Sequence, residues 1–297
     1  MSNFILILLC IAAGMLIKHK GFLPHNSHKS LNTLIIYLAL PAVSFKYLPN
    51  IHWTTQLLLP ALMPILIWCA SWLFVFIYAR ITHIDKKTQG ALRLVTGLCN
   101  TSFVGFPLIM AYFGEEKLSI AIICDQVTFA LFSTVGLITA IESGGNKVAI
   151  LTLLKKLFLF PPFLGCIAAL VIPNFADVSF LNPLFDKLAG TVAPLALFSI
   201  GLQLKFDGWR NEIKHLSSAL LFKLVISPLI ALGIVLSLSF KGDIAQISIF
   251  EMAMPTLLSS SILAEEYDVK PTLANLIIGV GILLSLITTG LWWLIIR

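Results

Sequence analysis

The sequence predicts an all-α polytopic membrane protein with ten transmembrane helices. Of its 297 residues, 58% are hydrophobic and only 11% are charged, whereas a soluble domain carries about 45–50% apolar and about 25% charged residues. Apolar stretches of the roughly 20 residues that a spanning helix needs recur along the chain, separated by short polar connectors. So few ionisable groups cannot cover a water-exposed surface, and we therefore expect the lipid bilayer to surround most of the chain.

The apolar stretches define ten predicted spans. They cover residues 3–17, 30–48, 55–79, 89–112, 117–141, 148–172, 181–203, 215–239, 244–265 and 271–296. Residues 3–17 lack the basic segment and the cleavage site of a secretory signal, so we expect a retained first helix. The five cysteines lie in apolar stretches without the paired spacing of a zinc site or a disulfide framework. We therefore expect buried free thiols, no metal and no cofactor.

The Lys and Arg residues predict the orientation of the chain. If the N-terminus is outside, the cytoplasmic connectors hold 14 of these 20 residues and the opposite connectors hold 5. Cytoplasmic loops of membrane proteins are enriched in Lys and Arg. We therefore expect both termini on the extracytoplasmic side of the cell membrane. The net charge of +6 is explained by this orientation, without a nucleic-acid partner.

The connector Glu142-Ser-Gly-Gly-Asn-Lys147 is the most polar one and lies near the centre of the chain. It divides the sequence into a first five-helix repeat at 1–142, a short cytoplasmic linker at 143–147 and a second repeat at 148–297. An odd number of spans in each half makes the second half enter the membrane from the opposite side. This arrangement predicts two inverted repeats, which are typical of secondary transporters.

Spans 4 and 9 each contain a proline and several polar residues where an apolar run should continue. Span 4 contains Asn100-Thr-Ser-Phe-Val-Gly-Phe-Pro107, and span 9 contains Met254-Pro-Thr-Leu-Leu-Ser-Ser-Ser261. Proline removes a backbone donor and clashes with the carbonyl four residues earlier. A rise of about 1.5 Å per residue places Asn100 roughly 18 Å and Pro255 roughly 17 Å into the membrane. We therefore expect helices 4 and 9 to be broken and to cross near the midplane; ordinary proline kinks are the alternative.

Polar and breaker residues of spans 4, 5 and 9 form the predicted substrate site. They are Asn100, Thr101, Phe103, Gly105, Pro107, Asp125, Gln126, Pro255, Ser259 and Ser260. Charges inside a membrane are costly and rare, so Asp125, Glu251 and Lys223 are candidates for ion coupling. The alternatives are a structural hydrogen bond for Asp125 and snorkelling to the interface for Lys223. Helices that restart after a break present free N–H groups, which favours an anionic group such as a carboxylate.

Several of these segments resemble the auxin efflux carrier family, which includes plant auxin exporters and bacterial malate or malonate permeases. The similar segments are Leu31–Ala42, Asn100–Pro107, Pro194–Leu202, Met254-Pro255 and Ile262–Tyr267. The resemblance covers nearly the whole chain. It implies a scaffold of spans 1, 2, 6 and 7, often dimeric, and a mobile transport domain of spans 3–5 and 8–10.

The resemblance also implies a substrate site where helices 4 and 9 cross. Asn100, Pro107 and Pro255 match the elements of that crossing, and Asp125 matches a polar site residue. Two features depart from the family. The linker between the halves is short where plant members have a long regulated loop, and Glu251 occupies a position where we expect an apolar or small residue.

The predicted function is secondary transport of a small organic anion by alternating access. The anion is a carboxylate such as malate or malonate, or an auxin-like weak acid. No G-x-x-x-x-G-K-[ST] motif occurs, which argues against ATP drive. A proton- or sodium-coupled symporter of a neutral or bile-acid-like solute is one alternative. An intramembrane aspartyl enzyme using Asp125 and Glu251 is another, as is a receptor that binds without translocation.

Overall fold

The structure is a computed structural model of the chain and describes residues 2–24, 26–51, 53–145, 158–204, 210 and 212–297. The regular secondary structure of these residues is helical, with one isolated bridge between Cys99 and Thr256. Six helical segments in the described part are long and apolar enough to cross a membrane: Asn3–Lys20, Thr55–Thr82, Glu115–Ser143, Ser179–Gln203, Ile213–Ser237 and Pro271–Ile296. The prediction of an all-α membrane protein is confirmed.

The first half of the chain contains helices α1 to α8 and three π-helical stretches. They are α1 (Ser2–Lys20), α2 (Ser27–Leu34), η1 (Ile35–Ala39), α3 (Leu40–Tyr47), α4 (Leu58–Thr82), α5 (Lys86–Gly97), η4 (Thr101–Gly105), α6 (Phe106–Tyr112), α7 (Leu118–Leu131), η6 (Phe132–Gly136) and α8 (Leu137–Ser143). Helix α5 begins at a side-chain cap, because the Asp85 carboxylate accepts a hydrogen bond from the Thr88 N–H at 2.8 Å. This bond lowers the pKa of Asp85.

The second half is helical in its described part. Its elements are α10 (Pro161–Val171), α11 (Asn182–Gly190), α12 (Val192–Gln203), α13 (Ile213–Leu221), η9 (Phe222–Ile226), α14 (Ser227–Ser237), α15 (Asp243–Met252), α16 (Ser259–Glu266) and α17 (Pro271–Ile296). Short 3₁₀ turns occur at Leu48–Asn50, Thr55–Leu57, Glu115–Lys117, Ile172–Asn174 and Ser179–Leu181. Residues 146 and 147 of the predicted linker, and the beginning of the predicted sixth span, lie outside the described residues.

Three of the π-helical stretches end two residues before a proline. Pro41 follows η1, Pro107 follows η4 and Pro228 follows η9. A proline ring clashes with the carbonyl four residues earlier, and in each case that carbonyl belongs to the π-helical stretch. The wider π turn moves the carbonyl away from the ring, so the helix continues past the proline.

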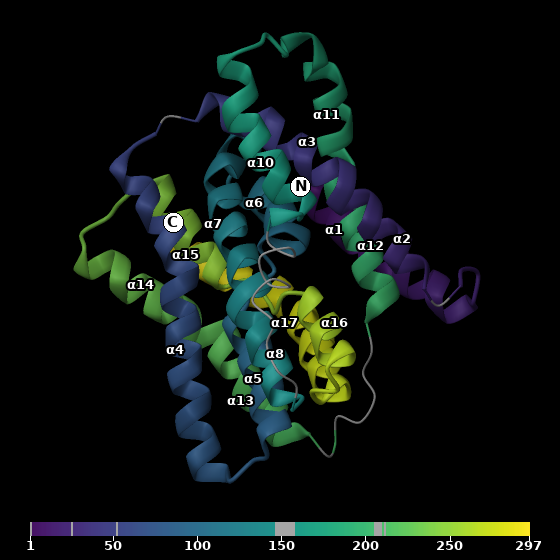
Figure 1. Cartoon of the computed structure of the whole chain (residues 1–297), viewed down its shortest axis with the longest axis vertical. Helices are drawn as coiled ribbons and strands as arrows, with labels where there is room; N and C mark the ends of the chain where they lie inside the picture. Colours follow the sequence, from purple (N-terminus) through teal and green to yellow (C-terminus); the bar gives the residue numbers. More distant parts are fainter. Residues whose placement is uncertain (1, 25, 52, 146–157, 205–209, 211) are drawn as a thin grey trace.

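The helices pack in two groups. In the first group α1 and α2 pack against α12, and α3 packs against α10 and α11. In the second group α4 packs against α5, α7, α14 and α15, and α13 packs against α5 and α17. Figure 1 shows α1, α2 and α12 on the right and α3, α10 and α11 at the top, while α4, α5, α8 and α13 reach the lower end.

The seam between α1 and α12 has no room for side chains at two glycines. A Cβ atom on Gly14 would lie 2.3 Å from the Phe198 carbonyl oxygen, and a Cβ atom on Gly201 would lie 2.3 Å from the Ile11 carbonyl oxygen. The two backbones are therefore in direct contact. Close approach through small residues is the usual way in which helices associate inside a membrane.

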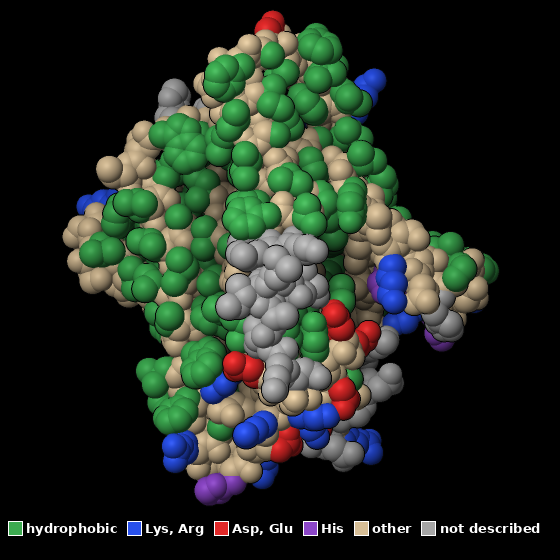
Figure 2. Space-filling view, viewed as in Figure 1, with side chains coloured by type: hydrophobic (Ala, Val, Ile, Leu, Met, Phe, Trp, Pro, Cys, Tyr) green, Lys and Arg blue, Asp and Glu red, His purple; other side chains and the backbone are tan. Residues whose placement is uncertain are grey.

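The surface is apolar where lipid would contact it. Large side chains such as Leu8, Leu73 and Phe175 are more than half exposed. In Figure 2 hydrophobic side chains cover the upper and left parts of the visible face, and charged side chains gather mainly toward its lower end. The cysteine prediction needs a correction: all five thiols are free, but only Cys10, Cys99 and Cys124 are buried, whereas Cys69 is exposed and Cys166 is intermediate. Thiols on a lipid-facing helix surface need no burial in protein.

Candidate functional site

Two helix breaks lie directly against each other in the core of the protein. The first separates α5 from η4 at residues 98–100, and the second separates α15 from α16 at residues 253–258. The Asn100 N–H donates to the Pro255 carbonyl at 2.8 Å, and the Leu257 N–H donates to the Leu98 carbonyl at 3.1 Å. This short antiparallel bridge satisfies backbone groups that would otherwise be unpaired far from water.

Side chains reinforce the bridge from both breaks. The Asn100 Oδ1 atom accepts from the Val104 N–H at 3.3 Å, and its Nδ2 atom donates to the Thr256 carbonyl at 3.5 Å. The Thr256 hydroxyl donates to the Val95 carbonyl at 2.6 Å, and the Ser260 hydroxyl donates to the Leu94 carbonyl at 3.4 Å. Asn100, Thr256 and Ser260 are at most 1% exposed, so each bond is protected from water.

The first break lies earlier in the chain than the sequence predicts. Pro255 lies inside the second break, but Pro107 lies in α6, several residues after the first one. The π-helical stretch η4 accommodates Pro107 and leaves the helix intact there. The non-helical residues are Leu98, Cys99 and Asn100, and the Asn100 side chain caps the helix that restarts at Thr101.

Asp125 lies beside the crossing and on the wall of a cavity. The Thr101 hydroxyl donates to its Oδ1 atom at 2.6 Å, and Asp125 is 7% exposed. The cavity has a volume of about 300 Å³. Its lining residues are Ile36, Leu40, Ser102, Asp125, Thr128, Phe129, Phe132, Ser133, Leu137, Phe160, Leu257, Ser259, Ile262, Leu263 and Glu266. A mostly apolar wall with a few polar groups is typical of small-molecule sites.

Both restarted helices face this cavity with their first turns. Ser102 is the second residue of η4, and Ser259 is the first residue of α16; both line the cavity. The positive end of the helix dipole lies at such first turns, although the Ser260 and Ser261 N–H groups already donate to the Leu257 and Leu258 carbonyls. The cavity therefore offers hydroxyl donors and favourable dipoles to an acidic group from two directions.

Glu251 lies at the crossing without a hydrogen-bond partner among the described residues. It is 0% exposed, and neither carboxyl oxygen forms a hydrogen bond with a residue that the structure describes. A Cβ atom on Gly105 would lie 2.8 Å from the Glu251 Oε2 atom. The carboxyl group therefore packs against the π-helical stretch of the first break, and a larger residue at position 105 would force it to shift.

Lys223 points into the protein and does not snorkel to the interface. It is 1% exposed, and its Nζ atom lies 2.7 Å from the Cys99 Sγ atom and 3.5 Å from the Thr96 carbonyl oxygen. The Cys99 Sγ atom in turn lies 3.9 Å from the Met252 Sδ atom. A positive side chain from η9 thus reaches the first break, and the alternative of snorkelling is wrong for this residue.

The structure brings together most, but not all, of the predicted site residues. Asn100, Thr101, Gly105, Pro255 and Ser260 lie at the crossing, and Asp125 and Ser259 line the cavity. Phe103 and Pro107 are buried in the helix after the first break, and Gln126 follows Asp125 on α7 with a buried Oε1 atom that has no hydrogen-bond partner among the described residues. None of these three lines the cavity.

The sequence reasoning missed the face of α7 and η6 that forms one cavity wall. Thr128, Phe129, Phe132 and Ser133 follow Asp125 at spacings of three, four, seven and eight residues and line the cavity with it. These spacings put all of them on one helix face. The pattern was visible in the sequence. Ser102 was inside the predicted motif but was not selected.

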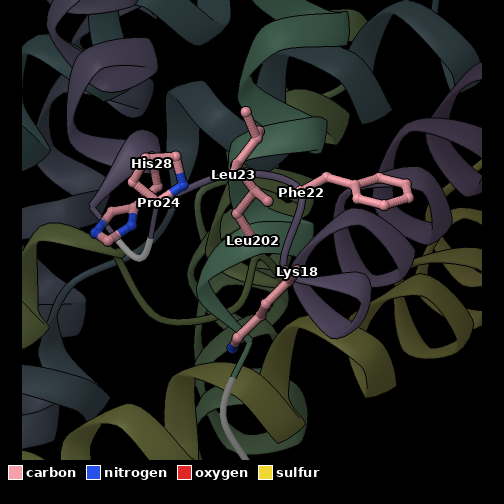
Figure 3. Close-up of a pocket in the computed structure, with 7 residues that line it drawn as sticks. Lys18, Phe22, Leu23, Pro24, His28 and Leu202 are labelled. Carbon is pink, nitrogen blue, oxygen red and sulfur yellow. The ribbon is translucent and has the colours of Figure 1, made fainter.

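Two further cavities lie near the end of α1. One of about 420 Å³ is lined by the connector after α1 and by Leu202, and Figure 3 shows Lys18 pointing from α1 toward the end of α12. The Lys18 Nζ atom donates to the Leu204 carbonyl at 2.5 Å. The other has a volume of about 570 Å³ and shares Ile36 and Ile262 with the cavity beside Asp125. A series of adjoining cavities therefore leads from the crossing toward the end of α1.

Comparison with known proteins finds relatives that align with nearly the whole chain. An uncharacterized transporter of Methanothermobacter thermautotrophicus is 27% identical over 289 residues, covering 96% of this chain and 95% of the relative. An uncharacterized transporter of Methanocaldococcus jannaschii is 27% identical over 307 residues, covering 100% and 99%. A protein of Rhizobium meliloti named "Putative malonate transporter" is 26% identical over 307 residues, covering 98% and 93%.

Residues 1–293 match the family described as "Membrane transport protein". The match extends from the first helix to the last turns of α17, so it includes both breaks and every wall of the cavity. The resemblance to auxin efflux carriers is confirmed at the level of the family. This chain belongs to the membrane transport protein family.

Proposed function

We propose that this protein is a secondary transporter of a small organic anion that binds in the cavity beside the crossing. The observation that carries the proposal is the convergence of the two restarted helices, because Ser102 and Ser259 line one cavity. Their first turns stabilise a carboxylate, and the apolar walls fit the rest of a small organic molecule. The name of the Rhizobium meliloti relative, which refers to malonate, is consistent with a carboxylate.

The proposed mechanism is alternating access between two groups of helices. The cavity walls come from both: Ile36 and Leu40 belong to η1 and α3, whereas Asp125 and Ser259 belong to α7 and α16. A movement of one group against the other would open the cavity to one side and then to the other. We assign α1, α2, α3, α10, α11 and α12 to a scaffold that forms a homodimer, and the remaining helices to the transport domain.

We further propose that the chain consists of two inverted five-helix repeats, each contributing helices to both groups, in a cell membrane with both termini outside. The equivalent position of the two breaks in the two halves supports this arrangement. In this orientation the cavities near the end of α1 face the cytoplasm, since Lys18 and the connector after it are on that side. The described conformation is then one in which the substrate site communicates with the cytoplasm.

The competing enzymatic function fits the site less well. An aspartyl mechanism requires two carboxyl groups that act on the same water molecule and substrate. Asp125 lines the cavity, but Glu251 is fully buried and does not line it. The two acids therefore do not present a shared surface to a bound molecule, which favours binding and translocation over hydrolysis.

The experiment that tests the function is uptake into proteoliposomes. Labelled malonate, malate and benzoate are offered to the purified protein, and we expect saturable uptake of at least one unmodified compound. Ser102→Leu and Ser259→Leu would fill the cavity between the helix ends and lower uptake about tenfold or more, the loss that corresponds to ~1.4 kcal/mol of weakened binding. Ser237→Leu, at an exposed position on α14, is the matched control.

Three results would contradict the proposal. Product formation from a labelled carboxylate without net flux would identify an enzyme. If both serine variants took up substrate at the wild-type rate, this cavity would not be the transport site. Saturable uptake of a neutral solute, with none of any carboxylate, would replace the anion by the neutral substrate class.

A further inference from the structure

Glu251 differs from Asp125 and Lys223, the other buried charged residues at the crossing, because no described residue forms a hydrogen bond or an ion pair with its carboxyl group. Asp125 accepts a hydrogen bond from Thr101, and Lys223 contacts Cys99 and the Thr96 carbonyl. Glu251 has neither exposure nor a hydrogen-bond partner among the described residues. An ionised carboxylate in such surroundings loses its hydration without replacement, so a neutral, protonated Glu251 fits this conformation.

We propose that Glu251 binds a coupling proton, so that one proton crosses the membrane with each substrate anion. The inference rests on the proposed transport function and adds its driving force. Glu251 takes up a proton on one carboxyl oxygen from the side where the anion binds. It releases that proton on the other side, where the carboxylate is regenerated, and no other bond forms or breaks.

The groups that face Glu251 come from a few elements. Helix α15 packs against α4, α7, α14 and α17, and α14 and α17 contain no charged or otherwise ionisable side chain within their bounds. The ionisable groups of α4 are Cys69, which is exposed, Tyr78, which is hydrogen-bonded to His215, and Arg80, which lies over Phe76. Asp125 and Cys99 act electrostatically on Glu251, and Glu251 and Lys223 in turn act on Cys124.

A proton suits this position better than a metal cation. A sodium ion needs several free oxygen ligands. Close to the Glu251 carboxyl, the Asn100 carbonyl already accepts from the Gly105 N–H at 2.9 Å. A proton requires only the carboxyl group itself.

The charge of the substrate gives the direction of coupling. A carboxylate in the cavity, Asp125 on its wall and an ionised Glu251 would place three negative charges close together. Protonation of Glu251 removes one of them and strengthens anion binding, and by linkage the bound anion strengthens proton binding equally. Proton and anion therefore move together. Asp125, which lines the cavity and acts electrostatically on Glu251, connects the buried acid to cavity water.

The test uses proteoliposomes with a pH indicator inside and labelled malonate, malate and benzoate as probes. We expect wild-type uptake to acidify the lumen and to be accelerated by an inward proton gradient. Glu251→Gln mimics the protonated side chain, so exchange of labelled for unlabelled substrate should continue while gradient-driven accumulation and lumen acidification are lost. Glu116→Gln, in an exposed connector, should behave as wild type. Gradient-driven accumulation by Glu251→Gln would overturn the proposal.

The two proposals fail in different ways. Uptake by the wild type without proton movement would overturn proton coupling and leave the transport function standing, whereas absence of any flux would count against the transport function. Infrared spectroscopy then tests Glu251 without a substrate. We expect the carbonyl stretch of a buried protonated carboxylic acid in the wild type and its loss in Glu251→Gln, and a wild type without this band would overturn the proposal. If Glu251→Gln does not fold, Glu251→Asp replaces it in these measurements. This variant keeps a carboxylic acid at the position, so it should retain proton movement and the infrared band.

Discussion

At the scale of single residues, the three buried charged residues of the crossing, Asp125, Lys223 and Glu251, differ in their partners. Asp125 has the Thr101 hydroxyl, Lys223 has a thiol and a carbonyl, and Glu251 has none among the described residues. The sequence predicts that each is buried and costly. It does not predict their partners, because these come from helices distant in the chain. The side-chain direction of Lys223 was open for the same reason.

The hydrogen bond between Thr101 and Asp125 should contribute measurably to stability. Thr101→Val removes one of the two side-chain donors to a buried carboxyl, the other being Ser102, and the loss of such a bond costs about 1–3 kcal/mol. We expect a lower Tm for this variant in detergent. Thr82→Val, at an exposed position whose hydroxyl bonds its own helix, should change Tm little.

A double variant isolates that interaction. Asp125→Asn in a Thr101→Val background should cost less than the sum of the two single changes, because both remove the same bond. Additive losses of Tm, or an unchanged Tm in Thr101→Val, would show that the bond does not stabilise the fold.

At the scale of elements, two prolines of the predicted motifs act in different ways. Pro255 lies in a non-helical segment, whereas Pro107 is accommodated by the π-helical stretch before it. The sequence predicts a disruption near both, but it cannot locate the first one, because a proline can either break a helix or widen it. In the structure, Leu98 and Asn100 pair with the backbone of the second break. The helix is therefore broken at residues 98–100 and widened, not broken, before Pro107.

Replacement of either proline should impair transport more than expression. In Pro107→Ala the π turn can relax to an α-helix, which would rotate Thr101 and Ser102 away from Asp125 and the cavity. In Pro255→Ala the second break loses its restricted backbone. We expect uptake to fall about tenfold in each, equivalent to ~1.4 kcal/mol.

The control for the prolines is Pro64→Ala. Pro64 is buried inside α4 and does not follow a π-helical stretch, so uptake should be largely retained. If Pro107→Ala transported as the wild type does, the π turn would not be what positions Ser102.

At the scale of the whole molecule, the two groups of helices meet at the cavities. The membrane class and the broken helices were predictable from apolar length and from prolines at mid-depth. The cavity was not, because its walls combine Ile36 and Leu40 with residues of α7 and α16. Which apolar side chains face a cavity rather than lipid depends on packing between segments, and a sequence this uniformly apolar gives little periodicity to read.

Linking the two groups should stop transport. Ile36 in η1 and Ile262 in α16 line both cavities, so cysteines at these positions would be joined by a bifunctional thiol reagent with a cleavable spacer. The five native cysteines are replaced first, in a background shown to retain uptake. We expect uptake to fall to the background level after linking and to recover after cleavage. Each single-cysteine variant should stay active, and undiminished uptake in the linked protein would contradict alternating access between these groups.

The bridge between Cys99 and Thr256 also has a consequence for biogenesis. Its hydrogen bonds join residues from opposite halves of the chain, so the first break has no backbone partner until the second half has been synthesised and inserted. During that interval unpaired amide and carbonyl groups lie in the hydrocarbon layer, where each costs several kcal/mol. The first break therefore gains its backbone partner only once residues 253–258 have been synthesised and inserted.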